Sequence, residues 1–283
     1  MAAEHAHEAL THAAAHDIPE LPNVITVLSE RWHDHPLVSW LHHWENLVFA
    51  ALVAFVLCLI TWRYSRRPST IPRGGQNVLE LLVEGVDNFI RSVLGDQGRQ
   101  FTPFIGTLFL YIWFMNLIGL VPGMKSPTSS LNTTIALAVT VFLYVQWTGL
   151  KRLGLLGYMD HLAGQPRDVV GWCMVPLMLP IHLLGELIKP LSLSLRLGFN
   201  VFAEDVLLAV LVGLGVTAGL MLHLPIGIPI QLFVVPLVLI FSTVQALVFS
   251  LLTSVYISQM LPHGEHHERT DIRYRPRQSI AGI

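Results

Sequence analysis

The stretch KPLSLSLRLGFNVFAED, from Lys189 to Asp205, decides the architecture of this chain because it places Arg196 inside an apolar tract covering residues 169–222. A guanidinium group keeps its charge at any physiological pH. Placing one at the centre of a bilayer costs about 2.5–3.5 kcal/mol on insertion scales, so an arginine at this depth marks a functional site. Arg196 is therefore the first candidate for the functional centre.

The composition is that of an integral membrane protein. Of the 283 residues, 53% are hydrophobic and 13% are charged, which is about half the charged fraction of a soluble domain. Most of the apolar tracts are long enough to cross a bilayer. They cover residues 47–62, 104–122, 134–150, 169–222 and 228–261. The sequence predicts an all-α integral membrane protein with one membrane domain over residues 46–262. The net charge of −2 argues against a nucleic-acid partner.

Both ends of the chain are polar. Residues 1–45 lack the apolar segment of a signal peptide. The irregular spacing of their histidines favours a solvated, His-rich extension over a metal site. These histidines are His5, His7, His12, His16, His33, His35, His42 and His43. Residues 263–283 form a predicted C-terminal tail.

Lysine and arginine residues cluster after three of the apolar tracts. The positive-inside rule places these clusters, and with them the C-terminal tail, in the cytoplasm. The N-terminal extension then lies outside, and about five membrane crossings satisfy the arrangement. The clusters are Arg63, Arg66, Arg67 and Arg73; Lys151 and Arg152; and Arg269, Arg273, Arg275 and Arg277.

Two further segments have a recognisable helical pattern. Residues 75–99 carry apolar side chains at helical spacing between charged ones, which predicts an amphipathic helix on the membrane surface or one that docks on a partner subunit. The tract over residues 169–222 is too long for one perpendicular span. It is either strongly tilted or broken at Pro176, Pro180 or Pro190. We expect two long, tilted, adjacent C-terminal helices.

Polar residues inside the last two tracts fall on shared helical faces. Within about 40° of Arg196 on a helix lie Lys189, Ser192, Asn200 and Ala203. In the last tract, Gln231, Ser242, Gln245 and Tyr256 share a face, which predicts a water-lined surface against the arginine-bearing helix.

The carboxylates in these tracts leave Arg196 without a counter-ion. Glu186 and Lys189 are three residues apart and neutralise each other, while Asp205 falls on the face opposite Arg196. A structural role, in which Arg196 caps backbone carbonyls, is the alternative. A membrane-buried arginine more often faces an ion pathway or a partner, so we expect its carboxylate partner on another subunit.

At this point the sequence resembles the a subunit of F-type ATP synthase, the stator half of the proton channel. Lys189–Asp205 resembles the family signature K-P-x-S-L-x-x-R-L-x-x-N-x-x-A-x-D/E, which places the essential arginine at Arg196. The last-helix motif places the family's glutamine at Gln245. The other similar stretches are STVQALVFSLLTSVYIS (242–258), NLIGLVPG (116–123) and SSLNTTIALA (129–138).

Two departures from the family pattern stand out. The family commonly reads R-L-F-G-N, whereas Gly198 and Phe199 are exchanged here. Some members carry a histidine seven residues before the glutamine, where this chain has Val238. Any titratable role of that histidine must be absent or fall to Glu204 or Asp205.

The resemblance implies a non-catalytic, proton-translocating subunit of the Fo sector with no cofactor or metal of its own. Two aqueous half-channels separated by Arg196 would pass protons to and from carboxylates of a rotating c-ring and so couple proton flow to ATP synthesis. Its other partners would be peripheral-stalk b subunits and the lipid of the cell inner membrane. Sodium remains an alternative to the proton, because ring residues decide the ion. The residues assigned to translocation are Arg196, Glu204, Asp205, Gln245, Asn200, Ser192, Glu186 and Lys189.

Two other functions compete with this interpretation. A secondary transporter that binds an anion at Arg196 would show internal repeats and paired broken helices, and the sequence shows neither. A membrane enzyme with a metal or haem centre would need convergent ligands, and His182 and His223 are isolated.

Overall fold

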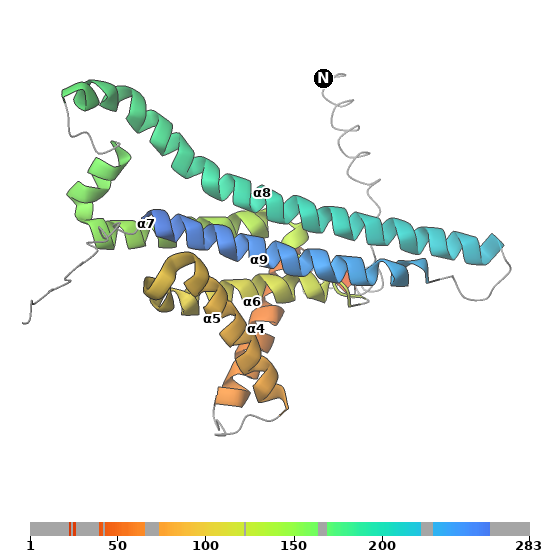
Figure 1. Ribbon diagram of the computed structural model, residues 1–283. Helices are drawn as coiled ribbons and strands as arrows, with labels where there is room; N and C mark the ends of the chain where they lie inside the picture. Colours follow the sequence, from red (N-terminus) through yellow and green to blue (C-terminus); the bar gives the residue numbers. More distant parts are fainter. Residues whose placement is uncertain are drawn as a thin grey trace, which may run out of the picture.

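The computed structural model describes residues 23, 25–26, 40–41, 43–65, 74–121, 123–163, 169–221 and 229–260. All regular structure in these ranges is helical, which confirms the predicted all-α fold (Figure 1). The elements are α4 (Glu45–Ser65), α5 (Gly75–Leu94), η1 (Gly95–Gln100), α6 (Thr102–Ile118), η2 (Pro127–Ser129), α7 (Leu131–Leu162), α8 (Val169–Met221), η3 (Ile230–Phe233) and α9 (Val235–Gln259). Most of the predicted N-terminal extension and the whole C-terminal tail lie outside the described residues.

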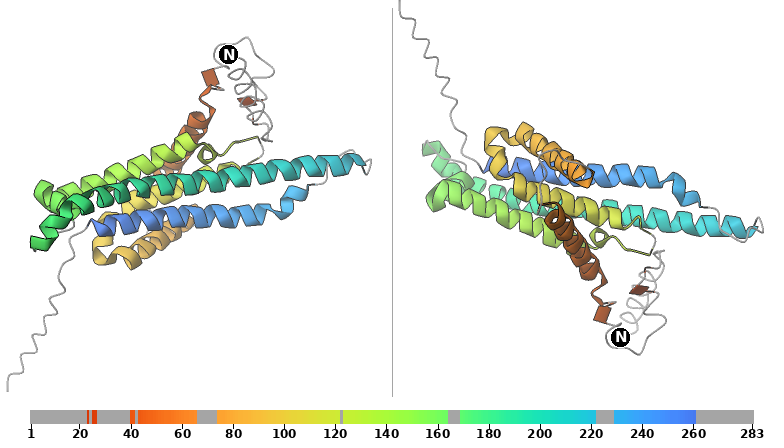
Figure 2. Two further views of the ribbon diagram at one scale, coloured as in Figure 1. Left: turned by 90° about the horizontal axis from the view of Figure 1, so that it is seen from above. Right: turned by 90° about the horizontal axis from the view of Figure 1, so that it is seen from below.

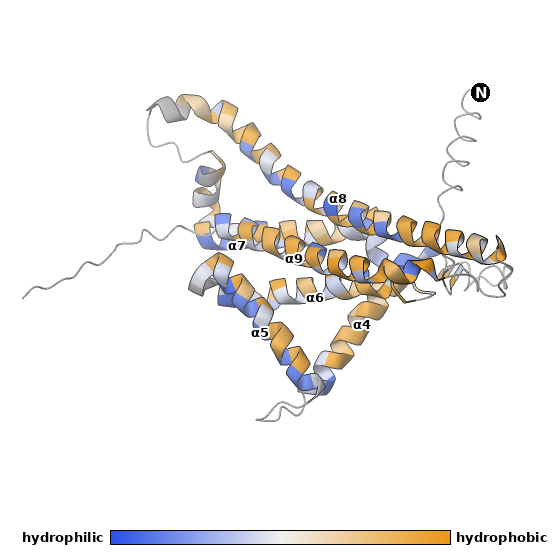
Figure 3. Ribbon diagram, turned by 45° about the vertical axis from the view of Figure 1, so that its right-hand side comes forward, coloured by the Kyte–Doolittle hydropathy of each residue, from blue (hydrophilic) through white to orange (hydrophobic). Residues whose placement is uncertain are grey.

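Four of the helices form one elongated bundle. Helices α6, α7, α8 and α9 run side by side when the molecule is seen from above and from below (Figure 2). Helices α4 and α5 project from one side of this bundle, and the apolar colouring continues along α4 (Figure 3). Helices α4, α7, α8 and α9 are long and apolar enough to cross a membrane, and α6 is a shorter apolar helix of 17 residues. The chain is therefore a multi-pass membrane protein.

The core and the outer surface are both apolar. Helix α6 packs between α4, α5 and α9, and its Ile105, Ile112 and Met115 are completely buried. On the outside, large apolar side chains such as Trp147 and Leu184 are more than half exposed. Lipid tails are as apolar as these side chains, so this exposure suits a bilayer and not water.

Helix α8 is continuous over 53 residues. At 1.5 Å per residue it is about 80 Å long, while the hydrocarbon core of a bilayer is about 30 Å thick. It must therefore be strongly tilted. Strong tilt was one of the two alternatives that the length of this tract predicted. Its N-terminal part bends away from α9 (Figure 1), in the segment that contains Pro176, Pro180 and Pro190. Proline removes a backbone hydrogen bond and kinks a helix.

The last helix is shorter than the tract over 228–261 suggested. It begins at Val235 with Pro236 in its first turn, and η3 precedes it. Gln231 belongs to η3 and lies outside α9. The prediction that Gln231 shares a helical face with Ser242 was therefore wrong, because α9 begins only at Val235, directly before Pro236.

Helix α5 is amphipathic, as predicted, but it packs on the chain with only part of its apolar face. Val86 and Ile90 are buried, whereas Val78 and Leu81 are about two-thirds exposed. Thr102 Oγ1, at the start of α6, donates a hydrogen bond of 2.6 Å to Asp87 Oδ1. This bond, together with the charge of Arg91 at 2.6 Å, lowers the pKa of Asp87 below its ordinary value of 3.8. The Asp87–Thr102 contact fixes the buried half of α5 to the bundle.

Helix α7 changes direction at Gly154. This residue has a φ of 69° inside the helix, a backbone conformation that glycine adopts without a steric penalty. The residues after it turn towards the start of α8 (Figure 1). His182 Nδ1 of α8 then donates a hydrogen bond of 3.0 Å to the backbone carbonyl oxygen of Leu162. The turn also brings Tyr158 next to the polar face of α8.

Candidate functional site

Helices α8 and α9 are antiparallel and are joined by three polar contacts. Lys189 Nζ donates to Gln259 Oε1 at 2.8 Å, and Asn200 Nδ2 donates to Gln245 Oε1 at 2.8 Å. Farther along α8, Glu204 Oε2 accepts a hydrogen bond of 3.3 Å from Ser242 Oγ. The polar face predicted for the last helix therefore lies against the arginine-bearing helix. These contacts divide into two groups, one on each side of Arg196.

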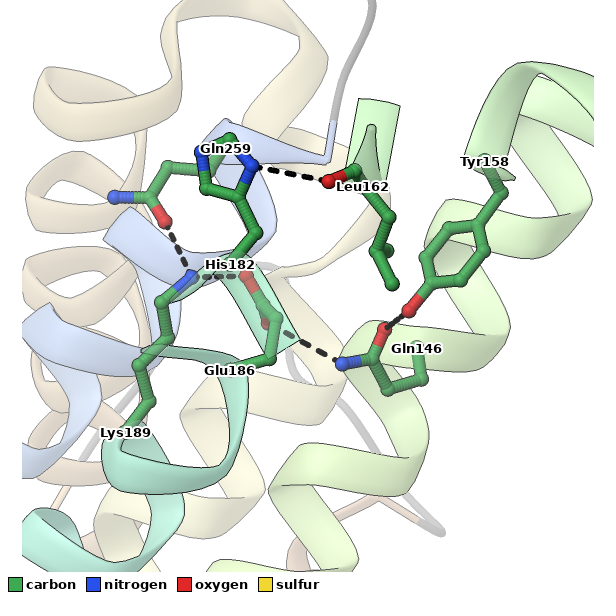
Figure 4. A network of polar contacts seen from close by, with 7 residues as sticks. All are labelled: Gln146, Tyr158, Leu162, His182, Glu186, Lys189 and Gln259. Atoms are coloured by element: carbon green, nitrogen blue, oxygen red, sulfur yellow. Dashed lines mark hydrogen bonds and ion pairs between the residues drawn. The ribbon is translucent and has the colours of Figure 1, made fainter. Parts of the chain in front are cut away.

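The first group, which we call the paired cluster, consists of Gln146, Tyr158, Glu186, Lys189 and Gln259 (Figure 4). Lys189 Nζ lies 2.5 Å from Glu186 Oε1. Gln146 Nε2 donates to Glu186 Oε2 at 3.2 Å, and Tyr158 Oη donates to Gln146 Oε1 at 2.6 Å. Helices α7, α8 and α9 all contribute to the cluster. Both carboxylate oxygens of Glu186 thus accept hydrogen bonds, and its charge is matched by Lys189.

The second group, which we call the open cluster, consists of Asn200, Glu204, Ser242 and Gln245. It borders a cleft of about 440 Å³ between α8 and α9, which Val238 and Phe241 also line. Glu204 accepts the one hydrogen bond from Ser242 described above and has no cation within ion-pair distance among the described residues. Gln245 Nε2 is buried and lacks a hydrogen-bond partner in the same part of the chain. The open cluster therefore has room, and an unused donor, for water.

Arg196 lies between the two clusters and joins neither. It is exposed at the surface of the chain, and no hydrogen bond or ion pair links its guanidinium to any residue that the structure describes. The side chains of Leu193 and Leu197 on the inner face of α8 are almost fully buried, so they fix the helix and turn Arg196 outward. Among the residues that the structure describes, Arg196 therefore has no counter-ion. A cation in this position on a membrane helix calls for a negative partner beyond the residues described here.

The other predicted site residues take different positions. Ser192 is exposed one turn before Arg196 and makes no hydrogen bond within the described ranges. Asp205 is half-buried and does not border the cleft of the open cluster. The sequence left open whether Glu204 or Asp205 replaces the missing histidine at position 238. Of the two carboxylates, only Glu204 lines the same cleft as Val238.

The exchange of Gly198 and Phe199 relative to the common family order fits the packing of α8 on α7. A Cβ atom on Gly198 would lie 3.0 Å from Leu131 Cδ2 and 3.1 Å from Thr134 Oγ1 of α7, whereas Phe199 is more than half exposed. The glycine thus occupies a position where α8 packs closely against α7. With the common order of residues, the phenylalanine would point into α7.

A buried hydrogen-bond network supports the open cluster from behind. Thr128 Oγ1 donates to Asn116 Oδ1 at 2.7 Å, and Asn116 Nδ2 donates to the backbone oxygen of Ser242 at 3.5 Å. All three residues are at most 4% exposed. Through this network the asparagine of the NLIGLVPG stretch holds α9 beside Glu204.

Sequence reasoning missed three members of the paired cluster, namely Gln146, Tyr158 and Gln259. A signal was present for Gln146, because it is an amide within an apolar membrane tract, where polar side chains tend to bond across helices. Tyr158 gave no such signal, since its position depends on the turn at Gly154. In the described part of the chain no three His, Cys, Asp or Glu residues come close enough together to hold a metal ion.

Fold and site together define a class: a polytopic α-helical membrane protein with an unmatched cation between two polar clusters. A family model for the ATP synthase A chain matches residues 47–258, and the chain belongs to this family. Subunit a of Protochlamydia amoebophila (strain UWE25) ATP synthase is 44% identical over 240 residues, covering 85% of this chain and 89% of the relative. Subunit a of Moorella thermoacetica (strain ATCC 39073 / JCM 9320) ATP synthase is 40% identical over 221 residues, covering 78% and 92%. Membership in the family implies a part in proton translocation.

Proposed function

We propose that this chain is the stator subunit of the Fo sector, in which two half-channels separated by Arg196 pass protons to and from carboxylates of a rotating c-ring. Proton flow through it would drive ATP synthesis. The observation that carries the proposal is the placement of Arg196: exposed, unmatched within the described residues, and flanked by a polar cluster on each side. Family membership supports the same conclusion.

The physical chemistry of one fixed cation explains the coupling. An opposite charge within about 4–6 Å favours the ionised form of a carboxylate, so a ring carboxylate gives up its proton beside Arg196. Away from Arg196, in lipid, only the protonated form is tolerated. The same cation prevents protons from passing directly between the half-channels. Moving each charge across the membrane supplies about 2.3 kcal/mol per 100 mV.

The two clusters would border the two half-channels. The open cluster, with Glu204 and Gln245 and with Asp205 nearby, would line the outer one. Glu186, Lys189 and Ser192 would border the inner one, towards the cytoplasm. This orientation rests on the distribution of lysine and arginine, which favours an outer N-terminus and a cytoplasmic C-terminus. The membrane would be the inner membrane of the cell. Peripheral-stalk b subunits would complete the stator, and the c-ring would select proton over sodium.

The decisive experiment replaces Arg196 by alanine in the intact ATP synthase. We expect ATP-driven proton pumping into inverted membrane vesicles to fall to background, because nothing would then ionise the ring carboxylate. Thr217→Ala is a matched control on α8, since its exposed hydroxyl bonds only to the backbone oxygen of Gly213 in the same helix. Full pumping by the Arg196→Ala complex would refute the proposal. Anion uptake by the purified chain alone in liposomes would favour a secondary transporter.

A further inference from the structure

Helix α8 carries two basic side chains on one face, and only one of them is unmatched among the described residues. Lys189 and Arg196 are the only lysine and arginine between residues 169 and 221. They are seven residues apart, which is two turns or about 10 Å along the axis and within about 20° around it. A ring carboxylate that passes Arg196 would therefore also pass Lys189. If both charges were available, the carboxylate would have two places to stop.

The structure surrounds Lys189 with groups that offset its charge. Its Nζ atom lies 2.5 Å from Glu186 Oε1 and 2.8 Å from Gln259 Oε1. It also lies 5.4 Å from the centre of the Tyr256 ring, a cation–π distance. Arg196 has none of these contacts with the described residues. Of the two cations on this face, Lys189 is paired and Arg196 is unpaired among the described residues.

Glu186 is held in place from the neighbouring helix. Gln146 of α7 donates to the carboxylate oxygen that does not contact Lys189, and Tyr158 fixes Gln146 in turn (Figure 4). The void that touches both Glu186 and Lys189 measures only about 10 Å³, which is room for about one water molecule. The cleft beside Glu204 is far larger, at about 440 Å³. Glu186 therefore has a fixed partner on each carboxylate oxygen, which suits a stationary charge and not a proton carrier.

We propose that Glu186 acts as a charge mask: it neutralises Lys189 so that, within the described length of α8, the rotor carboxylate meets Arg196 as the single unpaired cation. This inference rests on the proposed function, because it requires a carboxylate that moves past α8. It makes Glu186 a positioning residue for the transport step and removes it from the set of groups that carry protons. Lys189 remains useful as a structural link, since it joins α8 to α9 through Gln259.

The test is a double-mutant cycle in the intact ATP synthase, with ATP-driven proton pumping measured per assembled complex in inverted vesicles. Glu186→Gln should lower pumping about tenfold, because it leaves the charge of Lys189 unpaired about 10 Å from a ring carboxylate beside Arg196. At an effective dielectric constant of about 20, the attraction between these two unit charges corresponds to roughly that factor. Lys189→Gln removes the cation together with its charged bond to Gln259, so it should slow pumping less than Glu186→Gln does. The double variant Glu186→Gln/Lys189→Gln should recover to the same level, since it leaves no cation to mask.

The recovery distinguishes a mask from a proton carrier and from a purely structural contact. If Glu186 carried protons, the double variant would stay as slow as Glu186→Gln, and the proposal would be overturned. Unchanged pumping by Glu186→Gln would overturn it too. Failure of the double variant to assemble would also contradict the proposal, because two neutral side chains at positions 186 and 189 should not need an ion-pair partner. The swapped pair Glu186→Lys/Lys189→Glu keeps a neutral pair with both charges, and it should exceed Glu186→Gln in rate.

Arg196→Ala in the same assay separates this inference from the proposed function. If that variant still pumps, the rotor mechanism itself fails. If it is inactive and the double variant does not recover, the mechanism stands and only the mask is wrong.

Discussion

The paired cluster and the open cluster lie on the same two helices, and each contains one membrane-embedded carboxylate. Glu186 has a cation at 2.5 Å and an amide donor on its other oxygen, whereas Glu204 has one hydroxyl donor at 3.3 Å beside a cleft of about 440 Å³. Among the described residues, Glu186 is thus held by fixed partners on both oxygens, whereas Glu204 faces an open cleft. The two carboxylates differ in their partners and in the space beside them.

The largest effect should come from Glu204→Gln, which removes the exchangeable proton of the open cluster and leaves its shape. We expect ATP-driven proton pumping to fall about a hundredfold, near the lower end of what a positioned proton-transfer group contributes. The measurement is the initial rate of acidification in inverted vesicles.

The matched control for Glu204→Gln is Asp205→Asn on the next residue, which does not border the cleft. It should slow pumping much less. An equal loss in both variants would mean that the cleft does not single out Glu204, and the contrast between the clusters would lose its main support.

The contact between α8 and α7 at Gly198 should have an intermediate effect, this time on stability. Gly198→Ala places a Cβ atom 3.0 Å from Leu131 Cδ2 and 3.1 Å from Thr134 Oγ1, and overpacking of this kind costs about 1–3 kcal/mol. Gly213→Ala on the same helix meets nothing within 4 Å and should be neutral or slightly stabilising.

The measurement for this pair is the thermal denaturation midpoint of the purified complex, scored by release of the chain. If Gly198→Ala were as stable as Gly213→Ala, the close approach of α8 to α7 would not be what holds both clusters in register. A loss of pumping without a loss of stability would show that the glycine acts on the site more directly.

The smallest effect concerns pH and the helix outside the membrane spans. Thr102 first, and then Arg91, lower the pKa of Asp87. A carboxyl group with a lowered pKa in the folded state adds stability that is present above its unfolded pKa and lost as the pH falls through its folded pKa. The docking of α5 on α6 should therefore be constant from about pH 5 to pH 8 and should weaken only below the ordinary value of 3.8.

Amide hydrogen exchange over residues 75–94, corrected for the intrinsic rate at each pH, measures this docking. Asp87→Asn should remove the change at low pH, and Ser92→Ala on the same helix should keep it. A change in α5 between pH 5 and pH 8 would contradict the expectation. It would also mean that the pH dependence of pumping cannot be assigned to the two clusters alone.

Sequence alone determined the helical membrane fold, the amphipathic α5 and the unmatched Arg196. These features follow from local rules: a helical period of 3.6 residues, the length of an apolar tract and the cost of a charge in lipid. The same rules put Lys189, Asn200 and Arg196 on one face of α8. They failed at the start of α9, where the prolines move the helix boundary to Val235.

The partners of the two carboxylates come from other helices and could not be read from α8 itself. Gln146 of α7 and Gln259 of α9 contact Glu186 and Lys189, and Tyr158 reaches Gln146 because Gly154 turns α7. Glu204, and not Asp205, shares a cleft with Val238 because of the way α8 is rotated against α9. Contacts of this kind are set by the register and crossing of helices far apart in the chain, and a single helix's sequence does not encode them.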